Sequence, residues 1–293
     1  RIHYSDTKIN SELLDSWLKF RALNFLDIDP QHGPVNNIFT FGNQLYFWQD
    51  RAFGFLSVKE REVLSSTNTT NLVLGTGGIL DRYDYLSTVN GCINNTAICN
   101  SDATLYWFDG LNKEICGYSG KGVEKLSKTK GVQTWLNHLN TFTKTTKVDT
   151  VYDQQFNEVY FYLDNTTDKV LIYSESIEIF LGFNTYIPDL FIDNKNLLYS
   201  VKGNVLYKHN TNNKAEFYGN KVISYLKLLI NDQYATTKVF DSLEYQSNST
   251  AVNSNNVFET DYTNNTYDTF NTIKCYNDYQ NTDTIDLLNK VNY

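Results

Sequence analysis

Residues 104–127, TLYWFDGLNKEICGYSGKGVEKLS, decide the fold class. The apolar run LYWF at 105–108 consists of residue types that suit half-buried strands. Asp109-Gly110 is predicted to supply the positive φ angles of a tight hairpin, and residues 115–118 are predicted to return as the partner strand. Taken alone, this stretch predicts one β-hairpin.

Three other runs repeat its pattern of an apolar residue, Tyr, two mostly apolar residues and a polar turn. The four runs are LYFW at 45–48, LYWF at 105–108, VYFY at 159–162 and LYSV at 198–201. Their first positions are separated by 60, 54 and 39 residues, which suits one four-stranded sheet per unit but no named propeller repeat. We therefore predict an all-β fold, a divergent β-propeller-like array of antiparallel four-stranded blades with minor helix. A radial array would also protect the edges of many short hairpins.

Changes in composition divide the chain into three predicted parts. They are an N-terminal segment at 1–23, the propeller-like blades at 24–242, and an Asn/Thr-rich excursion with truncated C-terminal strands at 243–293. Short helices are predicted at 11–20 and at 131–141, the second burying Trp135 and Leu139. The last strand is predicted near 272–276.

The overall composition excludes several classes of protein. The chain has 293 residues, 41% hydrophobic and 15% aromatic with only 3 Pro, which favours a large β-rich core. A net charge of −8 argues against a general nucleic-acid surface, because such surfaces need clustered Lys and Arg. No apolar run approaches the roughly 20 residues that span a bilayer, so no membrane anchor is expected. The chain begins with Arg1 and lacks Met, and we expect it to be a processed or trimmed fragment.

Cysteine and histidine are sparse and match no metal or catalytic motif. Cys92, Cys99, Cys116 and Cys275 lack paired zinc-ligand spacing and are expected to be free thiols, with a Cys92–Cys99 bridge as the alternative. The histidines are His3, His32, His138 and His209, and no HExxH or GxSxG motif accompanies them. We therefore predict no catalytic, cofactor-binding or metal-binding residues, no cofactor and no enzymatic activity.

Two acidic residues and five arginines carry the remaining chemical alternatives. Asp27 and Asp29 lie on one face of a predicted strand, where they could bind a cation or act as an acid–base pair, but Asp before Pro30 more often caps a turn. A sialidase-like clamp of three arginines is not expected, because all five Arg lie in the first third of the chain. The Gly-rich segment LGTGGILDR at 74–82 lacks phosphate-loop and dinucleotide spacing and is expected to be a loop.

Five segments resemble a known family. They are NFLDIDPQHGPVNNIFTFGNQLYFWQDRAFGFLSVKEREVL at 24–64, LGTGGILDRYDYLSTVNGC at 74–92, LYWFDGLNKEICGYSG at 105–120, VYDQQFNEVYF at 151–161 and IKCYNDYQNTD at 273–283. These segments resemble a large tail protein of crAss-like bacteriophages, the one that forms the muzzle at the distal end of the short tail. The pattern departs after Asp283, which agrees with the expectation of a fragment.

The resemblance implies a non-catalytic structural protein of the virion tail, assembled in the cytoplasm of the bacterial host. It implies as partners further copies of the same chain, neighbouring tail proteins and remaining fragments of its own precursor, without nucleic acid. A glycan-binding or glycan-cleaving propeller that contacts the host surface stays open as the alternative.

Overall fold

The computed structural model describes residues 1–6, 15–58, 62–64, 72–74, 79–164, 169–194, 197–211, 216–221, 225–228, 230, 236, 239, 251–252, 258–259 and 272–286. The chain divides into two compact units, residues 1–225 and residues 226–293. The boundaries predicted from composition, after residues 23 and 242, stay a prediction. The predicted excursion at 243–271 lies largely outside the described residues.

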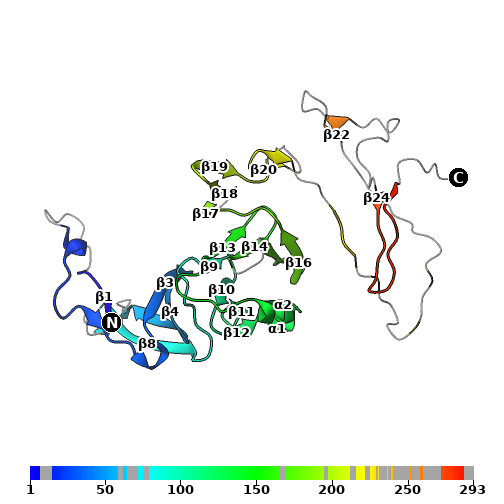
Figure 1. The fold of residues 1–293 in the computed structure, drawn as a ribbon. Helices are drawn as coiled ribbons and strands as arrows, with labels where there is room; N and C mark the ends of the chain where they lie inside the picture. The colour runs from blue at the N-terminus through cyan, green and yellow to red at the C-terminus, as the bar shows by residue number, and fades with distance from the viewer. Residues whose placement is uncertain are drawn as a thin grey trace. The chain divides into compact units, whose positions relative to one another are not determined.

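Among its described residues, the first unit contains four antiparallel sheets of three or four strands, whose strands follow chain order (Figure 1). Sheet 1 consists of β3 (Val35–Phe41), β4 (Gln44–Gln49), β5 (Phe53–Val58) and β8 (Leu80–Ser87), and sheet 2 of β9 (Ile98–Asn100), β10 (Leu105–Asp109), β11 (Glu114–Tyr118) and β12 (Val123–Lys125). Sheet 3 consists of β13 (Val148–Asp153), β14 (Glu158–Leu163), β15 (Val170–Ser174) and β16 (Ile179–Asn184), and sheet 4 of β17 (Leu190–Asn194), β18 (Leu197–Lys202) and β19 (Val205–Lys208). Every Tyr-containing run is the second strand of its sheet. The predicted succession of antiparallel sheets is confirmed.

The remaining elements are short. Two-stranded pairs are formed by β1 (Ile2–His3) with β2 (Phe25–Leu26), β6 (Glu62–Leu64) with β7 (Leu72–Leu74), and β20 (Glu216–Phe217) with β21 (Asn220–Lys221). The second unit contains β22 (Ala251–Val252) with β23 (Phe258–Glu259) and β24 (Thr272–Ile273) with β25 (Ile285–Asp286). The helices are η1 (Ser16–Leu18), η2 (Pro30–His32), α1 (Leu126–Thr129) and α2 (Gln133–His138). All-β with minor helix therefore describes this chain.

The helix predictions are confirmed in part. Within the helix predicted at 131–141, α2 buries Leu136, and Leu139 is buried directly after it, whereas Trp135 is only partly buried. Of the helix predicted at 11–20, residues 11–14 lie outside the described residues. The rest of that range contains the single 3-10 turn η1, whose Trp17 and Leu18 are exposed.

The turn between β10 and β11 differs from the predicted two-residue hairpin. Asp109 is the last residue of β10 and pairs with Glu114, so four residues form the turn, and its positive φ of 53° is at Lys113. The Asp109 carboxylate accepts hydrogen bonds from the backbone N–H groups of Leu111 and Asn112, both at 3.1 Å. Gly110 packs closely, because a Cβ there would lie 3.1 Å from the Cβ of Phe142. Close packing, and not a positive φ, therefore favours a glycine at this position.

The first strand of sheet 3 lies beside the first strands of sheets 2 and 4, because β13 contacts both β9 and β17. The backbone N–H of Thr150 in β13 also donates to the carbonyl of Thr96, just before β9, at 2.9 Å. Between sheets 1 and 2, the amide of Asn37 in β3 donates at 3.1 Å to the carbonyl of Asn94, in the connection that leads to β9. Sheets 2, 3 and 4 thus meet at their first strands, and the first strand of sheet 1 is joined to that connection.

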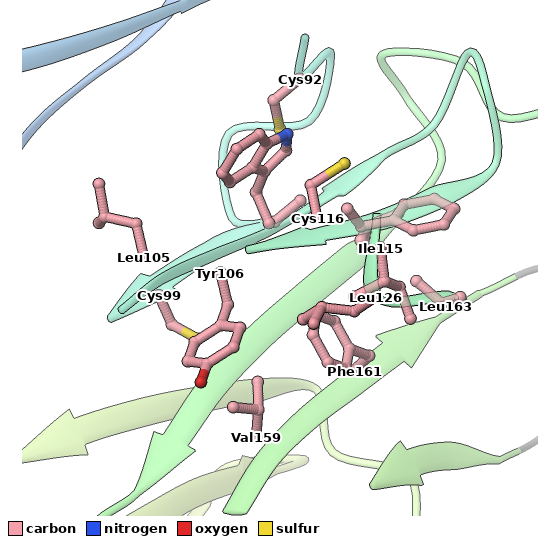
Figure 2. Packing of buried hydrophobic residues seen from close by; sticks show 14 of the residues in the cluster. Cys92, Cys99, Leu105, Tyr106, Ile115, Cys116, Leu126, Val159, Phe161 and Leu163 are labelled. Atoms are coloured by element: carbon pink, nitrogen blue, oxygen red, sulfur yellow. The ribbon is translucent and has the colours of Figure 1, made fainter. Parts of the chain in front are cut away.

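The main core lies between sheets 1, 2 and 3 and is rich in aromatic residues. Trp107 is completely buried, with its ring centroid 4.8 Å from that of Phe53 and 5.8 Å from that of Trp48. On the other side of sheet 2, Figure 2 shows Ile115 and Leu126 gathered with Phe161 from β14. A separate cluster fills the space between sheets 3 and 4, and a third covers the other face of sheet 1 with Ile2 and Ile28.

The substitution Trp107→Ala is expected to lower the free energy of unfolding by about 3–5 kcal/mol, because it removes a fully buried aromatic side chain and leaves a cavity between sheets 1 and 2. Urea unfolding monitored by circular dichroism measures the loss. The control is Trp17→Ala, which removes a 46% exposed ring and should change stability by less than about 0.5 kcal/mol. A stability of Trp107→Ala close to that of the natural chain would contradict the packing described.

Candidate interaction surface

One carboxylate joins sheets 2 and 3. Glu175 follows the end of β15, and its Oε1 accepts hydrogen bonds from Ser101 Oγ at 2.6 Å and from the hydroxyl of Tyr106 at 2.8 Å. Its Oε2 accepts from the hydroxyl of Tyr152 at 2.9 Å. Burial, and then the bond to Glu175, raise the pKa values of both tyrosines, so both hydroxyls stay protonated and can donate. Three donors from two sheets thus fix the angle between them.

A second carboxylate joins sheets 3 and 4. Asp149, in β13, is buried, and its Oδ2 accepts a hydrogen bond from the backbone N–H of Phe191 in β17 at 2.6 Å. Burial raises the pKa of Asp149 to about 6, although the Phe191 hydrogen bond acts to lower it. At the end of the same strand, Asp153 Oδ2 accepts from Asn210 Nδ2 at 2.8 Å. Sheet 4 is therefore held at a defined position by polar contacts as well as by its core.

The inner face of sheet 4 is buried against sheet 3. Phe191 and Leu198 lie in the cluster between the two sheets, with Tyr160 of β14. Ser200, paired with Phe191 in the sheet, lies on the same face and is fully buried. Its hydroxyl is 2.6 Å from His209 Nε2 and 2.9 Å from the hydroxyl of Tyr218.

The outer face of sheet 4 is also apolar, but exposed. We define it by Leu190, Ile192, Tyr199, Val201 and Leu206, which share a face because Leu190 pairs with Val201, Val201 with Leu206, and Ile192 with Tyr199. Leu190, Ile192 and Leu206 are 42%, 37% and 59% exposed. Apolar side chains on both faces are typical of a sheet that is covered on both sides. This outer face is the candidate interaction surface.

The opposite end of the array is covered by its own chain. The face of sheet 1 that points away from sheet 2 carries Phe47, Leu56 and Leu80, and these residues are buried against Ile2 and Ile28. The pairing of β1 with β2 holds this cover in place. The sheet array therefore has one covered end and one exposed apolar end within the described residues.

The two acidic residues singled out in the sequence do not act as a pair. Asp29 Oδ1 accepts from the backbone N–H of Gln31 at 2.9 Å and caps η2, as the turn interpretation predicts. Asp27 instead forms an ion pair with Arg1 at 2.7 Å. Two other arginines, Arg21 and Arg82, each pair with a different carboxylate and are not brought together. Residues 75–78 of the Gly-rich segment lie outside the described residues.

The Ser200–His209 contact is an arrangement that sequence reasoning missed. The two residues are nine positions apart and meet because the β18–β19 hairpin folds back. No sequence motif predicts this contact. Burial lowers the pKa of His209, and with Ser200 fully buried no substrate can reach the hydroxyl. The contact therefore lies in the interior beside sheet 4, where it joins β18 to the residue that follows β19.

The cysteines are free thiols, so the alternative Cys92–Cys99 bridge is wrong. Burial raises the pKa of Cys92 to about 12 and raises those of Cys99 and Cys116 well above the ordinary value, which makes these thiols unreactive. Among the described residues, no three His, Cys, Asp or Glu side chains gather in a group suited to a metal ion. No helix in that same part of the chain has the length and apolar character needed to cross a membrane.

Comparison with known families identifies the family of this chain. Residues 1–204 match the crassvirus muzzle protein family, and residues 212–293 match the C-terminal domain of the crassvirus muzzle protein. The chain belongs to the crassvirus muzzle protein family. The muzzle protein of Bacteroides phage crAss001 is 24% identical over 276 residues, which cover 92% of this chain and 19% of that protein. This member of the family thus spans about a fifth of the length of that relative.

Asp149→Asn in this muzzle-family chain is expected to raise the free energy of unfolding at neutral pH by roughly 3 kcal/mol, because the native carboxyl has a pKa of about 6 against an ordinary value of 3.8. Between those two pH values the native state binds more protons than the unfolded state, so the natural chain loses stability as the pH rises. Asn keeps an oxygen to accept from Phe191 without burying a charge. Urea unfolding from about pH 3.5 to about pH 7.5 measures the difference.

Asp189→Asn is the control and should have the opposite sign. A hydrogen bond from the backbone N–H of Gly203 lowers the pKa of Asp189, so its ionised form adds stability at neutral pH and the substitution removes it. A gain in stability from Asp149→Asn that is equal at every pH would contradict the role given to its buried charge.

Proposed function

We propose that this chain is a non-catalytic structural part of the muzzle in the tail of a short-tailed, crAss-like phage particle. The observation that carries the proposal is the exposed apolar outer face of sheet 4, at the end of an array of packed sheets, in a chain whose family is named for the muzzle. A large exposed apolar patch on a folded protein marks a surface that another protein covers. In this proposal the chain is assembled in the cytoplasm of the bacterial host and resides in the virion.

The array is propeller-like in this proposal. Each sheet is an antiparallel meander, and the first strands of sheets 2, 3 and 4 lie side by side, as inner strands do around the axis of a propeller. The covered end of sheet 1 and the exposed end of sheet 4 support an open array, which a neighbouring protein extends, over a ring closed within one chain.

The partners in this proposal are further copies of the chain, neighbouring tail proteins and other fragments of its precursor. Several identical copies around the tail axis would repeat one contact between two different surfaces, which closes a ring and leaves no end exposed. Burial of Leu190, Ile192 and Leu206 in that contact would remove the apolar surface from water.

Mass spectrometry of purified, denatured phage particles is expected to find peptides of this chain at a copy number that matches the rotational symmetry of the tail. Quantification against the portal and the tail proteins of the same particles gives that number. A virion without this chain, or with a single copy, would contradict the proposal and favour the glycan-binding alternative.

The chain is expected to hydrolyse neither sialosides nor polysaccharides, because its Ser200–His209 contact is buried and its acidic pair is separated. Release of reducing sugars from host capsular polysaccharide measures this directly. Turnover by the natural chain that is lost in Asp27→Asn would overturn the non-catalytic assignment, whereas equal background rates for both chains support it.

A further inference from the structure

Three polar side chains from distant parts of the chain meet beside sheet 1. Lys144 Nζ donates a hydrogen bond to Asn36 Oδ1 at 3.0 Å and lies 2.8 Å from Asp50 Oδ1. Asn36 Nδ2 donates to the same Asp50 oxygen at 2.7 Å. Each of the three groups therefore contacts the other two, and all three belong to the unit formed by residues 1–225.

The amide of this group is held by a β-bulge. Strand β3 shifts register between Val35 and Asn37, so Asn36 is the extra residue and has no paired residue in β4. A bulge re-aims the side chain that it carries. Besides its bond to Asp50, Asn36 Nδ2 donates to the carbonyl of Cys92 at 2.9 Å. The amide nitrogen thus has an acceptor for each of its two hydrogens, which fixes the plane of the amide.

The amine is held by a turn. Lys144 lies between α2 and β13, in a turn where the backbone N–H of Thr146 donates to the carbonyl of Thr143 at 3.1 Å. Asn94 Nδ2 donates to the carbonyls of both threonines, at 2.9 and 2.8 Å, and so attaches the turn to the connection between sheets 1 and 2. The side chain of Lys144 is 49% exposed, so it keeps freedom to rotate.

The carboxylate is placed to move protons between the two nitrogen atoms. Its Oδ1 contacts the amine of Lys144 and the amide nitrogen of Asn36. Its other oxygen lies against Gly33, because a Cβ there would be 2.7 Å from Asp50 Oδ2. An amine becomes a nucleophile when an adjacent base takes its proton, and a base that also touches the leaving group can pass the proton on. The side chain of Asp50 is only 24% exposed, which limits competition from water.

We propose that Lys144 and Asn36 form an intramolecular isopeptide bond, with Asp50 as the proton carrier. Lys144 Nζ gives one proton to Asp50, and its lone pair then forms a bond to Cγ of Asn36. The Cγ–Nδ2 bond breaks, and its electron pair leaves with Nδ2. A second proton from Nζ and the proton on Asp50 pass to Nδ2, which departs as ammonium. The charges balance, Asp50 is again a carboxylate, and the step consumes no oxidant, reductant or cofactor.

The contacts bring the reacting atoms close together. A nucleophile reacts efficiently when it is held roughly 3–3.5 Å from the atom that it attacks. Lys144 Nζ is 3.0 Å from Asn36 Oδ1, the oxygen bonded to Cγ, so a rotation of the lysine side chain brings Nζ over Cγ. A second set, Lys125, Glu114 and Asn90, has only two of the three contacts. Both of its nitrogens reach Glu114 Oε2, but among the described hydrogen bonds Lys125 does not reach the amide oxygen of Asn90.

The bond would lock sheet 1 to the connection that leads into sheet 3. It joins positions 36 and 144, so β4 to β12 and both α-helices lie within one closed loop. A link across a long loop stabilises a fold because it restricts the unfolded chain. The proposal is independent of the role in the muzzle, since the bond needs a single chain.

Mass spectrometry of the 293-residue chain tests the bond. Incubation at about pH 9 increases the neutral fraction of lysine amines, whose ordinary pKa is about 10.4. The intact mass should then be lower than that of the sequence by one ammonia. Trypsin should release a branched peptide that joins residues 22–51 to residues 131–147, because it does not cleave after a linked Lys144. A chain that keeps its full mass, or one that loses ammonia without this peptide, as a succinimide would, overturns the proposal.

Three substitutions assign the roles. Lys144→Arg keeps a positive charge beside Asp50 but replaces the amine with a guanidinium that stays protonated, so the branched peptide should be absent. Asp50→Asn removes the proton carrier and should slow the reaction at least roughly a hundredfold. Lys125→Arg alters the second set and should leave the reaction unchanged.

Circular dichroism of each variant establishes that it is folded before the comparison is made. Loss of ammonia in Lys144→Arg with residues 22–51 linked to another lysine would overturn the assignment of the nucleophile. An Asp50→Asn chain that is folded and reacts as fast as the natural chain would overturn the role of Asp50. Because Lys144 is exposed and Arg keeps its charge, that variant tests the proposal even where Asp50→Asn fails to fold.

Discussion

The need to cover both faces of each small sheet governs this structure. Every residue of β10 and β11 is buried, so sheet 2 has no face suited to water. A sheet of this kind would expose apolar side chains to water if it stood alone, so burial against its neighbours stabilises it. Sheet 2 receives sheet 1 on one side, through Trp107, and sheet 3 on the other, through Phe161. The outer face of sheet 4 has no such cover among the described residues and remains exposed.

Apolar packing determines that the sheets stack, but buried polar groups determine their relative placement. Asp109 and Glu114, at the β10–β11 turn, both accept hydrogen bonds from Asn90, which lies in the connection from sheet 1. Lys125 and Lys128 form ion pairs with Glu114 at 2.9 and 2.5 Å, and these bonds lower its pKa although burial acts to raise it. Hydrogen bonds are directional, so such a network tolerates one arrangement of its elements where apolar contact tolerates several.

Polar side chains of the described residues join neighbouring sheets. The partly buried Glu175 and the buried Asp149 each join two sheets, and the buried thiols are unreactive. The Ser200–His209 contact is inside sheet 4. Among the described residues, the outer face of sheet 4 is an exposed apolar surface that a structural role in an assembly would bury.

The all-β class, the four central strands and the burial of Trp107 followed from the sequence alone, because a short apolar run of strong strand formers such as LYWF is a local property. The close packing of Gly110 against Phe142 depends on a distant segment of the chain, so it could be seen only in the folded structure. The tertiary structure also revealed the Ser200–His209 contact and the hydrogen bond between Asp149 and Phe191. It revealed the exposure of one end of the array as well. They depend on which sheet lies beside which, and local patterns contain no information about neighbours.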